Sequence, residues 1–484
     1  MSTSAQSAFR GKVIAVSIAA ALGGFLFGFD TAVINTAVDA LAGPAPAGFD
    51  LGVGLKGFAV SSALIGCAVG AWFAGVVANR HGRVPTMVVA AILFFVSSVG
   101  SAFAFGPVDF IVWRMIGGLG VGAASVIAPA YIAEVAPAKI RGRLGSLQQL
   151  AIVTGIFTAL LTGAVFASAA GSAANVIWGM EAWRWIFLSE IIPASVYGIM
   201  ALRLPESPRY LVAKGELEKA GEVLTTVTGV IDVGPKIREI TGTIETERKE
   251  SLRDLRGSAL GLKPIVWIGI LLSVFQQFVG INVIFYYSTT LWRSVGFEES
   301  DALTITVITS VTNIVVTIIA ILLVDRVGRR IMLLVGSLGM TASLGIMAVA
   351  FSFATLITEV DGSQTASLDA PWSIVALICA NAFVVFFGAT WGPLVWVLLG
   401  EMFPNRIRAS ALAVAAAAQW AANFFISTTF PVFSDIGLTF AYGFYAFFAA
   451  ASFFFVYFMV PETKGMELEE MNDHPRVVRR VRTG

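Results

Sequence analysis

The chain has 484 residues, of which 57% are hydrophobic and only 13% are charged, about half the charged share of an ordinary soluble protein. This composition excludes a soluble globular protein of this size, because too little polar surface is available to coat it, and it predicts a lipid-covered exterior. A formal net charge of +1 also excludes a basic nucleic-acid-binding protein.

Apolar segments of about 20 residues, the length that spans a bilayer, recur about twelve times. The first, from Val13 to Phe29, is similar to the apolar part of a signal peptide, but it lacks a clear cleavage motif and continues past Asp30, so we interpret it as a membrane helix. Helices satisfy every backbone hydrogen-bonding group in lipid. We therefore predict an all-α membrane protein with twelve transmembrane helices. The later spans are expected to begin near Phe58, Thr86, Phe110, Ser146, Trp185, Pro264, Ala302, Ile331, Trp372, Ala409 and Leu438.

Short motifs occur twice along the chain, as in transporters built from internal repeats. EVAPAKIRG, which begins at Glu134, is matched 267 residues later by EMFPNRIRA, which begins at Glu401. NRHGR is matched by DRVGR, and PESPR by PETKG. We predict two six-helix bundles, residues 1–202 and 264–460, joined by a polar linker of short cytoplasmic helices, 203–263, and followed by a cytoplasmic tail, 461–484.

The basic residues are distributed unevenly between the two sides of this arrangement. With both termini in the cytoplasm, 28 of the 32 Lys and Arg residues fall on the cytoplasmic side, which the positive-inside rule favours. Only Lys56, Arg114, Arg184 and Arg293 do not. We predict a multi-pass protein of the plasma membrane with both termini inside.

Two opposite charges interrupt apolar spans, namely Asp30 in the first and Arg114 at the start of the fourth. A charge inside the membrane is costly and usually functional, and paired charges would offset part of each other's desolvation cost. The pair is either a static ion pair or part of a coupling or gating device. A third acid, Glu190, lies near a span, and we assign it no role.

Polar amides cluster in otherwise apolar spans of both halves. An amide supplies both donors and acceptors, which an uncharged polyhydroxylated ligand needs, and nearby aromatic rings can pack on the C–H face of a sugar. The alternative is that these amides hold helices together. The amides are Gln148, Gln149, Gln276, Gln277, Asn282, Asn313, Gln419 and Asn423, and the nearby rings are Trp396 and Trp420.

Charged residues recur at the predicted cytoplasmic helix ends. They serve either as positive-inside anchors or as ion pairs that link the two bundles when the inner side is closed. Partly exposed pairs are individually weak, on the order of 1 kcal/mol or less, which suits a gate that opens repeatedly. The candidates are Arg83, Glu134, Arg141, Arg326, Arg329, Glu401 and Arg408.

Enzyme chemistry finds no support in the sequence. The two histidines, His81 and His474, lie in a loop and in the tail, and no metal-ligand spacing, phosphate loop or nucleophile elbow occurs. We expect no enzymatic activity, no cofactor and no metal site.

Taken together, NRHGR, PAYIAEVAPAKIRGRLGSLQQL, PESPR, QQFVGINVIFYYS, DRVGRR, GPLVWVLLGEMFPNRIRA and PETKG resemble the sugar porter family of the major facilitator superfamily. The resemblance extends over essentially the whole chain, and WGPLVWVLLGEMF looks most like bacterial glucose and hexose permeases. One position departs from the family pattern, because the first-loop motif begins with Asn79 where Asp is usual, whereas the second repeat keeps Asp325.

The resemblance implies an alternating-access transporter that imports a monosaccharide, a glucose-like hexose, by proton symport. It implies that Asp30 and Arg114 form the proton site. Alternatives are a uniporter, a carrier of a polyol such as inositol, or a membrane sugar sensor. The expected partners are the sugar, protons and the lipid bilayer, with a monomer as the functional unit. The implied sugar contacts are Gln149, Gln276, Gln277, Asn282, Asn313, Trp396 and Gln419, and the implied lining residues are Phe27, Tyr286, Phe387, Gly392 and Trp420.

Overall fold

The computed structural model describes residues 3–136, 138–228, 232–246, 252–358, 364–403 and 407–462. Within these ranges, twelve helical stretches are long and apolar enough to cross a membrane. Their first residues lie close to the starts predicted from hydropathy, which confirms the all-α membrane fold class.

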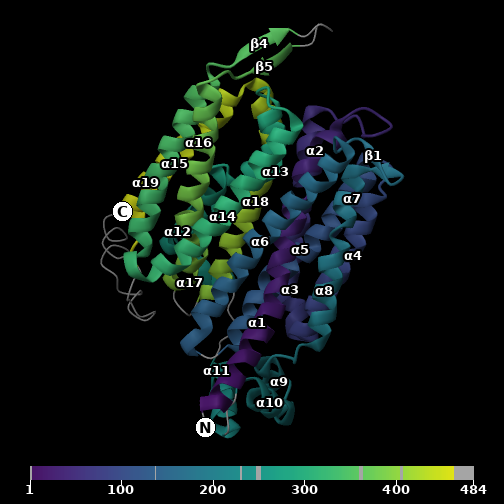
Figure 1. Ribbon diagram of the computed structural model, residues 1–484. Coiled ribbons are helices and arrows are strands. Elements are labelled where there is room, and N and C mark those ends of the chain that lie inside the picture. Colours follow the sequence, from purple (N-terminus) through teal and green to yellow (C-terminus); the bar gives the residue numbers. More distant parts are fainter. Residues whose placement is uncertain are drawn as a thin grey trace. The chain divides into compact units, whose positions relative to one another are not determined.

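The first half of the chain is almost entirely helical (Figure 1). One short hairpin, β1–β2, joins α6 to α7. The elements are α1 (Thr3–Ala32), α2 (Ile34–Ala42), α3 (Val53–His81), α4 (Arg83–Ala102), α5 (Pro107–Val135), α6 (Ala138–Ala170), β1 (Val176–Ile177), β2 (Met180–Glu181), α7 (Ala182–Leu188), α8 (Ile191–Arg203), α9 (Pro208–Ala213), α10 (Leu217–Val223), η1 (Leu224–Thr228) and α11 (Val233–Thr246).

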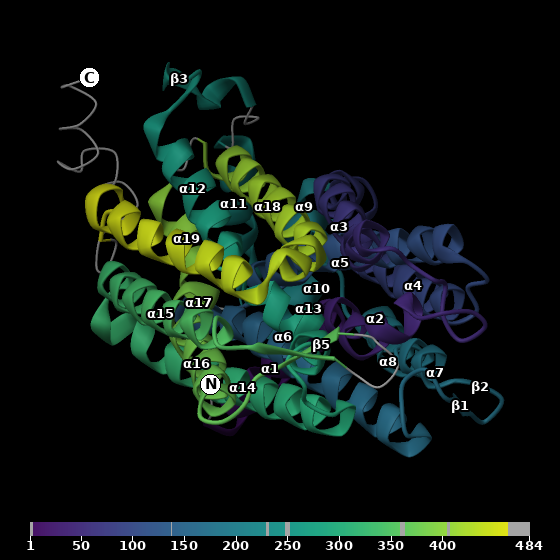
Figure 2. The same ribbon diagram turned by 90° about the horizontal axis from the view of Figure 1, so that it is seen from above.

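The second half repeats this helical pattern, and Figure 2 shows its helices α15, α18 and α19 from a second direction. A hairpin that the sequence does not predict, β4–β5, pairs Thr355 with Ser367. The elements are η2 (Leu252–Leu255), β3 (Arg256–Ala259), α12 (Pro264–Phe278), α13 (Ile281–Arg293), α14 (Glu299–Val327), α15 (Arg329–Phe351), β4 (Thr355–Thr358), β5 (Gln364–Ser367), α16 (Trp372–Phe386), η3 (Phe387–Trp391), α17 (Gly392–Met402), α18 (Arg408–Ile436) and α19 (Leu438–Met459).

The chain forms two compact units, and the limits between them fall inside α3 and α6 as well as between helices. The first unit contains Met1–Val33, Ser62–Thr162 and Trp183–Lys249, and the second contains Ile34–Ser61, Gly163–Ala182 and Glu250–Gly484. Parts of α3 and α6, and all of α2, therefore group with the helices of the second half. The domain boundaries expected from the sequence repeat stay a prediction.

In the first unit, glycines allow α3 and α5 to cross closely. A Cβ atom added at Gly66 would meet the backbone of Met115, and one added at Gly118 would meet the backbone of Ala63. Small residues spaced in this way bring helix backbones together in lipid, where no hydrophobic force drives association.

Two interrupted helices in the second unit position the predicted binding residues. Gly280 separates α12 from α13 with φ of 82°, a conformation that side chains with a Cβ rarely adopt. A π-helical turn, η3, separates α16 from α17, next to Pro393, which has no backbone N–H to donate. Such turns are frequent at functional sites.

The linker folds as the short helices that its sequence predicts. Leu211 and Val212 of α9 pack with Ala220 of α10, and Ile237 and Ile240 of α11 cover them. This small core packs the three short helices of the linker against one another.

Candidate functional site

Three of the predicted amides form a connected group where α12 meets α13. Gln276 and Gln277 end α12 and are buried, and Asn282 lies in the first turn of α13. The Asn282 Nδ2 atom donates to Gln277 Oε1 at 2.5 Å, and Gln277 Nε2 donates to Gln276 Oε1 at 3.4 Å. The break at Gly280 therefore brings together amides from two helices.

Gln276 also holds the π-helical turn in place. Its Nε2 atom donates to the carbonyl oxygens of Trp391 and Gly392, at 3.0 and 3.1 Å. Trp391 is fully buried and donates from Nε1 to the carbonyl of Leu333. The donors of Gln276 are thus used between helices, which is the alternative that the sequence left open for this amide.

The other candidate lining residues of the second unit have different surroundings. The Asn313 Oδ1 atom lies against Gly388, where an added Cβ would come within 2.9 Å of it. Among the described residues, Gln419 Oε1 is a buried acceptor without a hydrogen-bond partner. Trp396 is 43% exposed. Tyr286, Phe387, Gly392 and Trp420 are buried.

The remaining two candidates, Phe27 and Gln149, are half-buried and belong to the first unit. All the other predicted sugar contacts and lining residues belong to the second unit. Their roles as ligands of a sugar stay a prediction.

Asp30 and Arg114 form a buried ion pair in the first unit. Arg114 Nη1 lies 2.8 Å from Asp30 Oδ1, and Nη2 donates to the backbone oxygen of Asp30 at 2.9 Å. Their side chains are 0% and 1% exposed. The pairing that the two intramembrane charges suggest is present, and it leaves Asp30 Oδ2 as a buried oxygen with no partner in the described part of the chain.

Glu190, to which the sequence pattern assigns no role, belongs to the same buried region. Its backbone N–H donates to the carbonyl of Phe187, whose ring lies 5.6 Å from the Arg114 guanidinium carbon. Glu190 is 1% exposed. The signal available in the sequence is an acid in the apolar segment FLSEIIP.

At the end of the first unit that carries the basic motifs, Arg83 binds Glu134 with two hydrogen bonds, Nε–Oε2 at 3.0 Å and Nη2–Oε1 at 2.8 Å. Glu206 accepts from the backbone N–H of Arg83, and Ser207 donates to Glu134. Asn79, the departure from the family pattern, accepts from Arg83 Nη1 at 3.2 Å, so the asparagine keeps a bond to this arginine.

The second unit repeats this arrangement. Arg329 Nη2 lies 2.9 Å from Glu401 Oε1, and Glu462 accepts from the backbone N–H groups of Arg329 and Arg330. Each observed pair lies within one unit. The proposed links between bundles stay a prediction; Arg326 is exposed, and the side chains of Arg141 and Arg408 lie outside the described residues.

One buried polar residue of the second unit is absent from the predicted site. The Asn35 Nδ2 atom donates to the carbonyl of Phe285 at 2.9 Å, and Thr289 Oγ1 donates to Asn35 Oδ1 at 2.7 Å. Asn35 thereby ties α2 to α13, the helix that carries Asn282 and Tyr286. The signal in the sequence is an amide in the apolar run TAVIN.

Comparison with known proteins identifies relatives over nearly the full length. The family model described as "Sugar (and other) transporter" matches residues 16–474. A glucose transport protein of Synechocystis sp. is 57% identical over 462 residues, covering 95% of this chain and 97% of the relative. The D-xylose-proton symporter of Escherichia coli K12 is 39% identical over 491 residues, with 95% of each chain covered.

The fold is similar to that of a solved structure, the inward-open conformation of the xylose transporter XylE from E. coli. The TM-score is 0.80 at 36% sequence identity, and the match covers 95% of this chain and 99% of that chain.

Proposed function

Because this chain belongs to the sugar porter family of the major facilitator superfamily, we propose that it imports a glucose-like monosaccharide together with a proton by alternating access. The family assignment makes it a multi-pass integral membrane protein and a transporter rather than an enzyme. The identity of the sugar and the direction of transport are part of the proposal.

The amides at the junction of α12 and α13 are the single observation that best supports a sugar substrate. Gln277 and Asn282 form a polar surface inside apolar helices, and an amide can donate to one sugar hydroxyl while it accepts from another. A hexose carries no charge, so it needs no counter-ion. The similarity of this chain to a relative that is named a glucose transport protein favours a hexose over a pentose.

The buried Asp30–Arg114 pair supports proton coupling. An ionised carboxylate in the membrane is costly, and protonation of Asp30 removes its charge and weakens its hold on Arg114. A co-transported proton contributes about 2.3 kcal/mol per 100 mV of membrane potential. At about 1.36 kcal/mol per decade, that is roughly a 50-fold sugar gradient.

The two repeated arginine–glutamate clusters support a cytoplasmic gate. We propose that Arg83, Glu134, Arg329 and Glu401, with Arg141, Arg326 and Arg408, stabilise the closed inner side. We also propose that both termini are cytoplasmic, that the protein resides in the plasma membrane surrounded by lipid, and that one chain suffices for transport. The charge asymmetry supports the orientation.

The proposal is tested by uptake into vesicles that contain the purified protein. Radiolabelled D-glucose, other hexoses, D-xylose and myo-inositol are offered with and without an acid-outside pH gradient. We expect a hexose to accumulate above the medium concentration only with the gradient, while protein-free vesicles show neither effect. Equilibration that the gradient does not change would make the protein a uniporter, and failure to move any of these compounds would refute sugar transport.

A further inference from the structure

Two of the four cations outside the predicted cytoplasmic side meet at a single carboxylate in the second unit. Lys56 Nζ lies 2.7 Å from Asp39 Oδ1, and Arg293 Nη1 lies 3.4 Å from Asp39 Oδ2. The Thr290 hydroxyl donates to Oδ1 at 2.9 Å. The positive-inside rule disfavours basic residues on that side, and in the structure both of these bind the same carboxylate.

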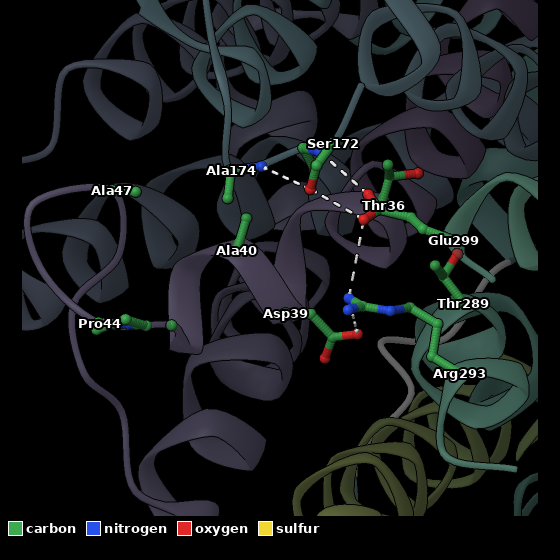
Figure 3. Close-up of a pocket in the computed structure, with 12 residues that line it drawn as sticks. Thr36, Asp39, Ala40, Pro44, Ala47, Ser172, Ala174, Thr289, Arg293 and Glu299 are labelled. Carbon is green, nitrogen blue, oxygen red and sulfur yellow. Dashed lines mark hydrogen bonds and ion pairs between the residues drawn. The ribbon is translucent and has the colours of Figure 1, made fainter. Parts of the chain in front are cut away.

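A second carboxylate extends this cluster. The Ser172 hydroxyl donates to Glu299 Oε2 at 2.9 Å, and the backbone N–H of Ala173 donates to Oε1 at 3.0 Å. Arg293 Nη1 lies 4.0 Å from Glu299 Oε2 and so stands between the two acids (Figure 3). We call Asp39, Lys56, Ser172, Thr290, Arg293 and Glu299 the outer latch.

The outer latch joins segments that come from the two sequence repeats. Asp39 lies in α2, Lys56 at the start of α3 and Ser172 after α6, all from the first repeat, whereas Arg293 ends α13 and Glu299 begins α14. All of them belong to the second compact unit. Helix α14 has 29 residues and is therefore about 43 Å long at 1.5 Å per residue. Its other end carries Arg326 of the DRVGR motif. The latch therefore lies at the opposite end of the helices from the basic motifs.

A cavity of about 250 Å³ adjoins the latch. Asp39, Arg293 and Glu299 line it together with Thr36 and Ala40 (Figure 3). Ala40 is only 6% exposed although it faces this cavity. A reagent that reaches residue 40 from outside therefore reports separation of the segments around it.

The latch acts on a helix that carries candidate sugar contacts. Below Asp39 on α2, Asn35 holds α13 through Phe285 and Thr289, and α13 is separated from α12 at Gly280. A helix that begins at such a break can move apart from its neighbour without unwinding it. Separation of α2 from α13 would thus uncover the side of α13 that Asp39 contacts.

We propose that the outer latch holds the non-cytoplasmic side closed and that its ion pairs break each time this side opens to admit sugar. This inference rests on the proposed function and names the residues that control one of its steps. Its pairs are partly exposed, so each is weak, and a barrier divided among several weak pairs can open repeatedly.

The test measures how fast an introduced cysteine, Ala40→Cys, reacts with a membrane-impermeant maleimide added outside intact cells. Asp39→Asn removes two ion pairs at once and is expected to speed labelling roughly 2- to 30-fold, from the range measured for such pairs. Glu299→Gln should also speed it. Asp39→Glu, which keeps the carboxylate, should stay slow. The chain without the cysteine at position 40 supplies the background from Cys67 and Cys379, which are buried.

The matched control is Asp50→Asn, which neutralises an exposed acid of the same connection outside the latch. The inference is overturned if Asp39→Asn is labelled at position 40 no faster than the protein with an intact latch. It is also overturned if Asp50→Asn speeds labelling as much as Asp39→Asn does. Labelling does not require transport, so the two proposals fail separately. Faster labelling in a protein that moves no sugar keeps the latch and refutes sugar transport, whereas unchanged labelling in an active transporter refutes the latch alone.

Discussion

At the scale of single residues, the extent of burial separates two kinds of ion pair in this protein. Asp30 and Arg114 are almost completely shielded from solvent, whereas Arg83 and Glu134 are partly exposed. Removal of one partner from a buried pair leaves an uncompensated charge and typically costs about 3–5 kcal/mol. A partly exposed pair contributes about 1 kcal/mol or less. Protonation therefore changes the free energy of the ion pair much more at Asp30 than at Glu134.

The residue-scale prediction concerns Asp30→Asn. The amide imitates the protonated acid permanently, and Arg114 keeps its bond to the backbone oxygen of residue 30. We therefore expect the variant to bind and exchange sugar but to lose accumulation against a gradient. The measurement is sugar-induced alkalinisation of the medium, together with uptake, in cells that express each form.

The control for this experiment is Asp109→Asn, because Asp109 lies in the first turn of α5, outside the buried pair. It should keep proton uptake and accumulation. If Asp30→Asn still concentrates sugar, Asp30 is a structural partner of Arg114 and the protein is a facilitator.

At the scale of helices, breaks in regular structure place the polar groups. Gly280 lets α12 end and α13 begin within one membrane span, and the π-helical turn η3 interrupts the span that contains Pro393. Inside a membrane, backbone groups released by such breaks need partners within the protein. Gln276 supplies one of them, because its amide donates to the backbone of Trp391 and Gly392.

The element-scale prediction separates amides that bind sugar from an amide that joins helices. Gln277→Ala and Asn282→Ala should each weaken sugar binding about 5- to 150-fold, the equivalent of about 1–3 kcal/mol for a lost buried hydrogen-bond partner, with a small change in Tm. Gln276→Ala should in addition lower Tm, because it leaves the link between α12 and η3 broken. Binding is measured by calorimetry and Tm by thermal unfolding of purified protein in detergent.

Normal sugar affinity in both Gln277→Ala and Asn282→Ala would show that these amides only hold helices together. A Tm of Gln276→Ala equal to that of the unsubstituted protein would contradict the linking role of Gln276.

At the scale of the whole molecule, charge clusters occur at both ends of the helices. Arg83–Glu134 of the first unit and Arg329–Glu401 of the second each lie beside a basic motif, and within the second unit the outer latch lies at the other end of α14. Alternating access requires each side to be closed in turn, and ligands shift such a protein between the two closed forms according to their differential affinity. Which cluster faces the cytoplasm depends on the orientation of the chain, which the basic residues predict.

The whole-molecule prediction is therefore topological. A fluorescent protein that folds only in the cytoplasm should be bright when fused after Gly484, and alkaline phosphatase, active only outside, should be inactive there. The paired control is a phosphatase fusion placed after residue 358, between the sequences of β4 and β5, where activity is expected. An active phosphatase at the C-terminus would reverse the orientation and exchange the proposed roles of the two charge clusters.

The sequence by itself determined the number and approximate limits of the spans, because a bilayer requires long apolar helices whatever their neighbours are. It also determined the family, through motifs such as NRHGR and PESPR, which have the counterparts DRVGR and PETKG in the second half. The pairing of Asp30 with Arg114 followed from the cost of isolated charges in lipid. These are properties of composition and local pattern.

Only the tertiary structure decided which partner each polar group has. Gln276 and Gln277 are adjacent and chemically identical, yet one amide bonds the backbone of η3 and the other accepts from Asn282. Asp39 is one acid among many in the sequence, and its meeting with Lys56 and Arg293 depends on packing of α2 against α13. Contacts between residues some 250 positions apart depend on how helices pack, and hydropathy carries no information about which face of a helix meets which neighbour.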